Sequence, residues 1–453
     1  MNSTALDPAV VLPMPAISPD RGGLQVLMGL RRNAYTAFPA RCLDEPVVSY
    51  RVAGRTLVLT AWPDAVRHVM ITHADDYVRL PVGRRVLGPI VGQGLLVSEG
   101  EPWRRQRRAM SPAFTPRNVP MLTQHIIRCT EAACRRLELS CGAPIDLLRE
   151  MQMLSLEIAA TSLFSLEVST FGPQLQRMTS EYMQTVGRLY LSDVLLPEGV
   201  PTIHRVRRAL FRRRWTRLMR TIVQQRRAAG PVSTARDLFD LLSEAHAADH
   251  EDLLLDEVST MIVAGHETTA LTLFWACTLL AHAPQWQAAI AEEASRTDLS
   301  VEAAASGMSS LVMTRAVVQE TLRLYSPAFM TGRLALRSHE VCGTTIPERS
   351  IVLLPYWLLH RSPRWWVRPE VFDPSRFLNG REPDRFTFLP FGIGRHVCIG
   401  AQLALSESIL AVASLVRRFT VTLTGERPVL PVGTLSTRPD HSPRFVLRPR
   451  RMG

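Results

Sequence analysis

The pattern of apolar and polar positions predicts a chain that is mostly helical, with a few short strands near its two ends. Residues 46–60 alternate β-forming and polar residues around the turn pair Ala53-Gly54, which predicts an early hairpin. The period becomes helical over residues 61–77 and stays mostly helical over residues 103–290. Glycine and proline pairs predict interruptions of the second helical region at three places, residues 172–173, 197–201 and 230–231.

Outside these regions the pattern is less regular. Residues 81–100 contain five glycines and two prolines, and we expect a long irregular loop there. Strand-like alternation returns over residues 344–356 and 420–424. No internal repeat or linker is apparent. The sequence therefore predicts one mainly α domain with small β-sheets, an α+β class, over residues 1–453, with residues 1–46 as a lead-in.

Composition narrows the classes of function. The formal net charge is +12, and every one of the 53 residues in the Lys+Arg count is arginine, because the chain has no lysine. A Schiff-base lysine and a Walker-A lysine are therefore excluded. Ten arginines fall within residues 205–227, a density that allows nucleic-acid binding. No base-reading motif accompanies them, so we expect a solvated helix face and no nucleic-acid partner.

Cysteine usage and the N-terminal sequence indicate a reducing compartment. The seven cysteines form no CxxC pattern, so neither a disulfide framework nor a zinc or iron–sulfur site is expected. Prolines interrupt the first apolar residues, and the other apolar runs are too short to cross a membrane. We expect a cytoplasmic protein with no integral membrane segment and no signal peptide.

The strongest chemical signal is a glycine-punctuated loop, residues 391–400, that presents Cys398. Its glycines permit backbone conformations that a Cβ forbids and let a flat ligand approach. A predicted helix starting at Ala401 aims free N–H groups at the sulfur, where they favour a thiolate that can bind a metal. A lone cysteine among apolar residues is more often a small buried hydrophobe.

The spacing of five residues decides between these readings: the positions of Phe391, Gly394, His396, Cys398 and Gly400 resemble the haem-ligand loop of the cytochrome P450 family. The resemblance implies that Cys398 is the thiolate ligand of a haem b iron, and that the fold is a triangular helical body with a small β-rich subdomain. It also implies that Phe391, Gly392, Gly400 and Ala264 lie against the haem.

A second motif lies inside a helix predicted over residues 252–281. Gly265 and the hydroxyls of Thr268 and Thr269 weaken a helix locally, and the helix could open there to admit water or dioxygen. Glu267 and Thr268 offer an acid beside a hydroxyl, as proton delivery requires. A buried helix with a satisfied threonine is the other interpretation. The segment resembles the oxygen-activating acid–alcohol pair of the same family, which assigns Glu267 and Thr268 as catalytic.

Further residues are assigned by spacing and resemblance together. Glu320 and Arg323 share a helix face and can pair, either as a surface ion pair or, as the resemblance implies, in a buried triad with Arg376 that supports the cysteine loop. Trp103 and Arg107, one helical turn apart, could bind an anion together through the indole N–H and the guanidinium.

In the family such positions hold the haem propionates, together with the equivalents of Arg333 and His396. This sequence departs from the family in two places, with His396 where arginine is commoner and Arg349 where a turn glycine is usual. Arg349 is therefore expected to strain the backbone locally.

The resemblance implies a haem-thiolate monooxygenase that inserts one atom of O2 into an apolar substrate by hydroxylation or epoxidation. We expect a monomer with no fused reductase, served by a separate ferredoxin with its reductase or by a flavodoxin-type donor. Arg104 and Arg108 form a helix stripe where an acidic donor could approach. The alternatives are a peroxide-using or non-oxidative haem-thiolate enzyme and a non-catalytic haem-binding protein. The Glu267–Thr268 pair argues against the first.

Substrate identity stays open. Four segments that face the distal side in the family are rich in leucine, valine, isoleucine and methionine, which indicates a largely apolar substrate. The segments are residues 81–96, 189–203, 258–264 and 328–330.

Overall fold

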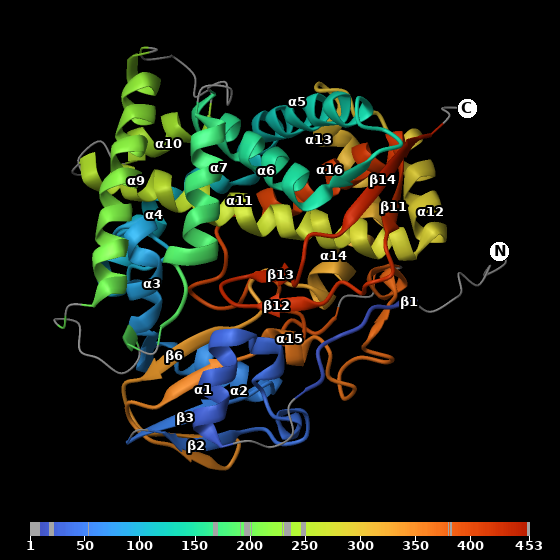
Figure 1. The fold of residues 1–453 in the computed structure, drawn as a ribbon. Coiled ribbons are helices and arrows are strands. Elements are labelled where there is room, and N and C mark those ends of the chain that lie inside the picture. Colours follow the sequence, from blue (N-terminus) through green and yellow to red (C-terminus); the bar gives the residue numbers. More distant parts are fainter. Residues whose placement is uncertain are drawn as a thin grey trace.

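A computed structural model shows a helical body above a smaller part rich in β-structure (Figure 1). It describes residues 10–450 except 18–21, 53, 166–170, 191, 194–199, 201, 229, 231–236, 246–250, 379 and 381–382. Among the described helices, none is both long and apolar enough to cross a membrane. The predicted class, mainly α with small sheets, is confirmed.

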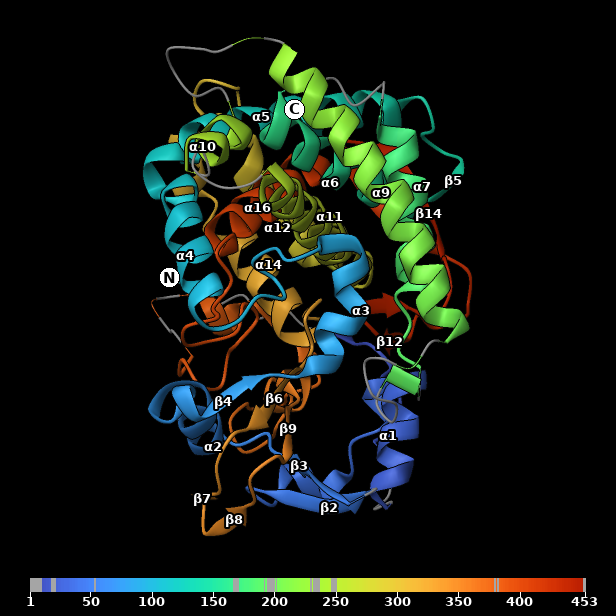
Figure 2. The same cartoon turned by 90° about the vertical axis from the view of Figure 1, so that its left-hand side faces the viewer.

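The helices account for most of the chain. Their bounds are α1 Gly23–Arg32, α2 Pro63–Arg67, α3 Pro81–Val91, α4 Gly100–Met110, α5 Val119–Glu138, α6 Leu147–Phe164, α7 Gly172–Glu181, α9 Ile203–Ala228, α10 Leu238–Ala245, α11 Glu251–His282, α12 Pro284–Ser295, α13 Ala304–Gly307, α14 Val312–Leu324, α15 Tyr356–Leu359 and α16 Ala401–Arg418. The helix predicted over residues 252–281 is thus α11, which runs through the middle of the body between α6 and α16 (Figures 1 and 2).

The strands are short. They are β1 Val10–Val11, β2 Val48–Val52, β3 Arg55–Leu59, β4 Tyr77–Arg79, β5 Pro144–Asp146, β6 Thr331–Ala335, β7 His339–Val341, β8 Thr344–Ile346, β9 Ile351–Leu354, β10 Val371–Phe372, β11 Phe419–Thr424, β12 Pro431–Gly433, β13 Thr437–Pro439 and β14 Arg444–Pro449. The predicted hairpin is confirmed, because β2 and β3 pair antiparallel from Val48–Leu59 to Val52–Arg55. These strands belong to a five-stranded sheet of order β2-β3-β9-β6-β4, in which β3 and β9 are parallel.

Among the residues that the structure describes, two hydrophobic cores lie in the helical body and a third lies against the sheet. The inner side chains of α11, such as Phe274 and Trp275, pack with α16 and α5 in one core. The distal helices α3, α6 and α9 form another with the N-terminal half of α11. Val58 and Leu353, on neighbouring strands, belong to the sheet's own core with α2. A cavity lies where α11 meets loops from the β-rich part.

The prediction of an irregular loop over residues 81–100 is wrong for the first half of that range, which forms helix α3. Pro81 starts the helix where its missing N–H costs nothing. Val86 and Ile90, one turn apart, are buried against neighbouring helices, and this packing overrides the weak helix propensity of the glycines. Residues 92–99 are irregular, as predicted.

Three other expectations need adjustment. The helix predicted over residues 61–77 ends near Thr72, because Tyr77 already belongs to β4. The arginine block is only partly solvated: Arg208 and Arg226 of α9 are buried in ion pairs with Asp193 and Asp237. The breaks expected at residues 197–201 and 230–231 fall mostly outside the described residues.

Arg349 has a φ of 65°, in the left-handed region, so the local strain expected at this position is present.

Candidate functional site

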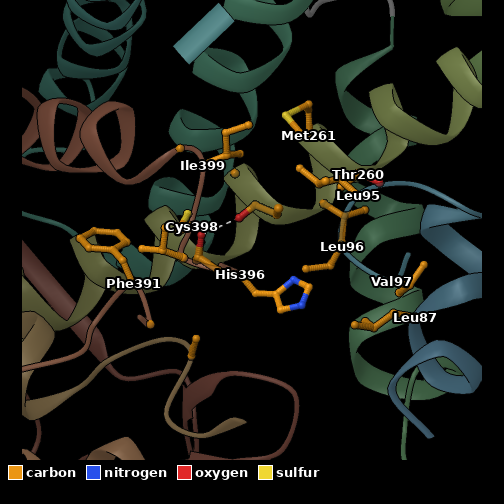
Figure 3. Close-up of a pocket in the computed structure, with 18 of the residues that line it drawn as sticks. Leu87, Leu95, Leu96, Val97, Thr260, Met261, Phe391, His396, Cys398 and Ile399 are labelled. Atoms are coloured by element: carbon orange, nitrogen blue, oxygen red, sulfur yellow. Dashed lines mark hydrogen bonds between the residues drawn. The ribbon is translucent and has the colours of Figure 1, made fainter. Parts of the chain in front are cut away.

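A cavity of about 1280 Å³ lies between α11, α3, the β-rich part and the loop that carries Cys398 (Figure 3). All eleven residues that the sequence assigns to catalysis or cofactor binding line it. They are Trp103, Arg107, Ala264, Glu267, Thr268, Arg333, Phe391, Gly392, His396, Cys398 and Gly400. The structure therefore brings together residues from four separate stretches of the chain.

The Cys398 loop is held by its own backbone and by a close contact with the β-rich part. The Cys398 N–H donates to the carbonyl of Phe391 at 3.0 Å, which closes the loop around the sulfur. Gly392 and Gly394 have φ values of 71° and 78°, which favour glycine. A Cβ on Gly394 would lie 2.2 Å from the Met70 carbonyl oxygen, so no larger residue fits there.

Gly400 does not follow the expected pattern. It precedes α16 with a φ of −91°, which any residue can adopt, so the expectation of a special backbone conformation is wrong at this position. Its nearest neighbour for an added Cβ is Phe114 at 3.9 Å. The lack of a side chain at Gly400 therefore matters for the open space beside the sulfur and not for the turn.

The Cys398 thiol is exposed to the cavity but lies deep in the protein. Desolvation raises its pKa, while the Gly400 N–H and the Arg107 guanidinium lower it, and the net shift is upward. The helix N–H groups alone therefore do not produce the thiolate that the sequence led us to expect. A cation bound at the sulfur would supply the missing stabilisation, because metal binding displaces the thiol proton.

A group of cationic side chains lies at one edge of the cavity beside His396. Trp103 and His396 are in ring contact, with centroids 4.3 Å apart, and Arg107 donates to the Val397 carbonyl at 2.9 Å. Burial, together with Arg79, Arg333, Arg395 and Arg107, lowers the pKa of His396 to about 2. His396 is therefore neutral and can donate one N–H.

Arg79 was missed by the sequence analysis. It lies on β4, where it donates from Nη1 to the carbonyls of Leu95 at 3.1 Å and Ser98 at 2.8 Å, and it contributes to the positive field at His396. An isolated arginine in a three-residue strand carries no motif. Only the register of β4 against β6, which pairs Arg79 with Arg333, shows that both arginines serve one site.

The edge beside His396 fits the two carboxylates of a haem. Arg79, Arg107 and Arg333 gather there, and Glu99 is an acidic side chain beside them, 3.8 Å from Arg79 Nε and 3.6 Å from His396 Nε2. Among the described residues, His396 Nδ1 is buried without a hydrogen-bond partner. A dianionic edge would satisfy both the excess positive charge and this nitrogen. The cavity also offers a sulfur ligand, Cys398, for the iron.

The motif on α11 lies on the opposite wall. Thr268 Oγ1 donates to the Ala264 carbonyl at 2.6 Å, so the expected competition for the i−4 carbonyl is confirmed. The helix nevertheless stays continuous from Glu251 to His282, and the opening expected at Gly265 is not present. The polar groups that α11 presents to the cavity are therefore side chains and not backbone groups freed by a break in the helix.

Glu267 is buried in an ion pair that the sequence did not suggest. Its Oε1 lies 2.5 Å from Nη2 of Arg438, on β13, and its Oε2 accepts from Gln152 at 3.3 Å. Burial raises the pKa of Glu267, and Arg438 and Gln152 lower it in part. The carboxyl therefore stays protonated to higher pH than an exposed glutamate would.

The triad of Glu320, Arg323 and Arg376 is formed, with Glu320 and Arg323 fully buried and Arg376 12% exposed. Arg323 donates twice to Glu320, each time at 2.7 Å, in a bidentate pair with no solvent exposure. Arg376 completes the triad at 3.4 Å from Glu320. None of the three lines the cavity. Arg323 also donates to the carbonyls of His360 and Pro369, which ties the segment before the cysteine loop to α14.

Of the four segments expected to face the distal side, three contribute to the cavity wall, through residues such as Leu87, Met261 and Met330. Figure 3 shows Leu87, Leu95 and Leu96 across the cavity from Cys398. The fourth segment, residues 189–203, lies largely outside the described residues. The wall is predominantly apolar, as predicted.

Comparisons with known proteins agree with this geometry. The profile described as Cytochrome P450 matches residues 30–443. A Mycobacterium tuberculosis protein named for that family is 30% identical over 446 residues, which is 92% of this chain and 93% of the relative. The cyclooctat-9-en-7-ol 5-monooxygenase of Streptomyces melanosporofaciens is 32% identical over 82% of each chain. The crystal structure of the cytochrome P450DA haem domain superimposes with a TM-score of 0.82 at 22% identity, over 98% of this chain and 99% of that one.

Proposed function

Because the chain belongs to the cytochrome P450 family and is a monooxygenase of that family, we propose that Cys398 ligates the iron of a haem b and that the cavity above it receives an apolar organic substrate. The observation that carries this proposal is the placement of Cys398 opposite Ala264 and Thr268 across one cavity whose edge is lined by Arg79, Arg107 and Arg333. When bound, the haem supplies O2 activation and the thiolate directs electron density towards O–O cleavage.

Side chains of the protein bind the haem, shield the sulfur and transfer protons. Arg107, Arg333 and neutral His396 hold the propionates, with Arg79 adding positive charge. Phe391 and the closed loop shield the sulfur, which keeps it in a low-dielectric setting. Thr268 and Glu267 hold and pass protons at the distal wall, with Arg438 setting the acidity of Glu267. The Glu320 triad positions the loop and takes no part in chemistry.

The cavity wall supports an apolar substrate. Leucine, valine and methionine side chains exclude water and bind by burial, and the few polar groups among them orient the substrate. The named relatives include a monooxygenase and, in Arabidopsis thaliana, a cytokinin hydroxylase, which supports oxygen insertion as the reaction. The proposal therefore covers hydroxylation or epoxidation.

Electrons would come from a separate acidic redox protein. Arg104, Arg105 and Arg108 are exposed on α4, the helix whose Arg107 contacts the residue next to Cys398. Charges at such a rim act mainly on the association rate. The exposed arginines of α4 support docking of the donor on the cysteine side of the proposed haem.

The test is turnover with an external electron supply. Purified protein, NADPH and a ferredoxin with its reductase are combined with apolar compounds selected by their spectral shift, under isotopically heavy dioxygen. The proposal expects a product that carries one heavy oxygen atom and forms only with the full donor chain. Product formed from peroxide but never from the donor chain would favour the peroxide-using alternative. Haem binding without any product would favour the non-catalytic one.

A further inference from the structure

Three histidines that play no part in the proposed reaction meet at the edge of the β-rich part. They are His68 and His73, at the two ends of a single helical turn, and His339 on β7. One ligand nitrogen from each lies within 4.8 Å of the others. The imidazoles of His68 and His73 are stacked at 4.1 Å, and that of His339 meets them edge-on at 5.4 and 4.9 Å. Figure 2 shows β7 below α2 and β4 in this part of the molecule.

A carboxylate completes the group. Asp76 Oδ2 lies 3.5 Å from His73 Nδ1 and 3.5 Å from His339 Nε2. Four ligands around a metal at 2.0–2.1 Å stand roughly 3.3–3.4 Å apart along the edges of a tetrahedron. The two Asp76 distances are therefore close to those that a shared ion would require. The other oxygen, Oδ1, is turned towards Arg337 at 3.2 Å, which orients the carboxylate.

Two of the ring nitrogens lack a hydrogen bond. Within the described part of the chain, His68 Nε2 and His339 Nε2 are buried and make none, and His339 Nε2 has only the Asp76 carboxylate at 3.5 Å. Leaving a buried polar group without a partner costs about 1–3 kcal/mol. If the three imidazoles only packed together, this cost would apply to His68 Nε2 and, in part, to His339 Nε2. A bound cation would satisfy both nitrogens.

We propose that His68, His73, His339 and Asp76 form a binding site for a divalent transition metal of the zinc type. Three imidazole nitrogens and one carboxylate oxygen are the ligands that such ions take in four-coordinate protein sites. The side chains of His339 and Asp76 are 10% and 18% exposed, whereas that of His73 is 39% exposed, so the ion has a route from solvent.

The position of the site suggests what the metal does. His68 to Asp76 form the segment on which the cysteine loop rests, because Gly394 is in contact with the Met70 carbonyl. Arg395 donates to Asp75 at 2.6 Å and to the Tyr77 carbonyl at 2.9 Å. An ion that joins this segment to β7 therefore fixes the support of the loop that carries Cys398. The site itself does not depend on the proposed reaction.

The test is metal binding by the untagged holoprotein. After treatment with a chelator and desalting, zinc chloride is titrated by calorimetry, and the zinc-loaded protein is studied by X-ray absorption at the zinc edge, which the haem iron does not disturb. We expect one equivalent of zinc, a spectrum of nitrogen and oxygen neighbours with imidazole scattering, and a higher melting temperature with zinc. His339→Asn should weaken binding about tenfold or more. His282→Asn, which changes an exposed histidine at the end of α11, should not.

Three results would overturn the proposal. The first is the absence of a stoichiometric binding event in the wild-type protein. The second is equal affinity in the His339→Asn and wild-type proteins. The third is a zinc spectrum dominated by sulfur at about 2.3 Å, which would assign the metal to a cysteine. The absorption spectrum uses wild-type protein, so it decides the matter even if the variant fails to fold.

Discussion

Glu267 and Arg438 form an ion pair across the wall of the cavity, with 2.5 Å between Oε1 and Nη2, although they lie far apart in the sequence. Glu267 is 3% exposed, and burial raises its pKa while Arg438 lowers it. A residue on β13 thus offsets part of the effect of burial on the acidity of the proposed proton donor.

Replacing Arg438 by glutamine should move the pH dependence of product formation. Without the guanidinium, the Glu267 pKa rises further, so the carboxyl stays protonated to higher pH and the alkaline limb of the profile, where this proton donor is lost, shifts to higher pH. The measurement is the rate of product formation from pH 5 to 9 under full electron supply. A Glu267→Gln variant, which cannot titrate, should lose that limb altogether. An identical profile in Arg438→Gln and wild type would remove this carboxyl from the proton path.

Thr268→Ala should separate electron input from product formation. Removal of the hydroxyl disturbs proton delivery, so NADPH is consumed but peroxide is released and coupling to product falls about tenfold or more. Coupling is measured as product formed per NADPH, with peroxide assayed in parallel. The control is Thr272→Ala, one turn along the same helix, whose hydroxyl donates to the Thr268 carbonyl at 3.0 Å. Equal coupling in the two variants would mean that Thr268 has no special role.

Arg323→Lys should destabilise the protein strongly, although the charge is kept. Lysine cannot reproduce the two parallel bonds to Glu320, and disruption of a fully buried pair costs about 3–5 kcal/mol in the free energy of unfolding. Urea unfolding of the holoprotein measures the loss. Arg296→Lys is the matched control, because its i,i+4 pair with Glu292 is 75% and 62% exposed, and we expect a change below about 1 kcal/mol there. Equal losses in both variants would contradict a buried role for the triad.

These residues also show what the sequence could and could not predict. The Cys398 loop, the pair of Glu320 with Arg323, and the pair of Trp103 with Arg107 were predicted because their signals are local, resting on glycine spacing or on positions that share a helix face. Helix α11 was predicted almost to its ends because its apolar positions repeat over many turns.

Arg79, Arg438 and helix α3 were missed for the opposite reason. Arg79 acquires its role from the register of two short strands, and Arg438 meets Glu267 only after β13 has packed near α11. The glycines of α3 disfavour a helix on their own, and burial of Val86 and Ile90 outweighs them. Each case depends on tertiary contacts that no local pattern encodes.

A buried carboxyl on α16 should make stability depend on pH. Burial raises the pKa of Glu407 from 4.5 to about 8, and among the described residues Ser155 is its hydrogen-bond donor. Because the folded pKa lies above the unfolded one, this stabilising contribution is complete below pH 4.5 and is lost as the pH rises through about 8.

Glu407→Gln should therefore gain stability relative to wild type between pH 5 and pH 8, by on the order of a few kcal/mol in the free energy of unfolding. Urea unfolding at several pH values measures this difference. Glu302→Gln, which changes an exposed carboxyl, is the control. A difference between Glu407→Gln and wild type that stays constant with pH would show that Glu407 does not titrate with a raised pKa.

The proposed role of Cys398 as the thiolate ligand of a haem can be measured in the absorption spectrum of the reduced carbonyl complex. The wild-type protein should show the red-shifted Soret band of thiolate ligation, and Cys398→Ala should lose it. Cys277→Ala, at a cysteine buried in the core around α11, should keep it. Persistence of the band in Cys398→Ala would mean that another cysteine binds the iron, and would contradict the account of the site given above.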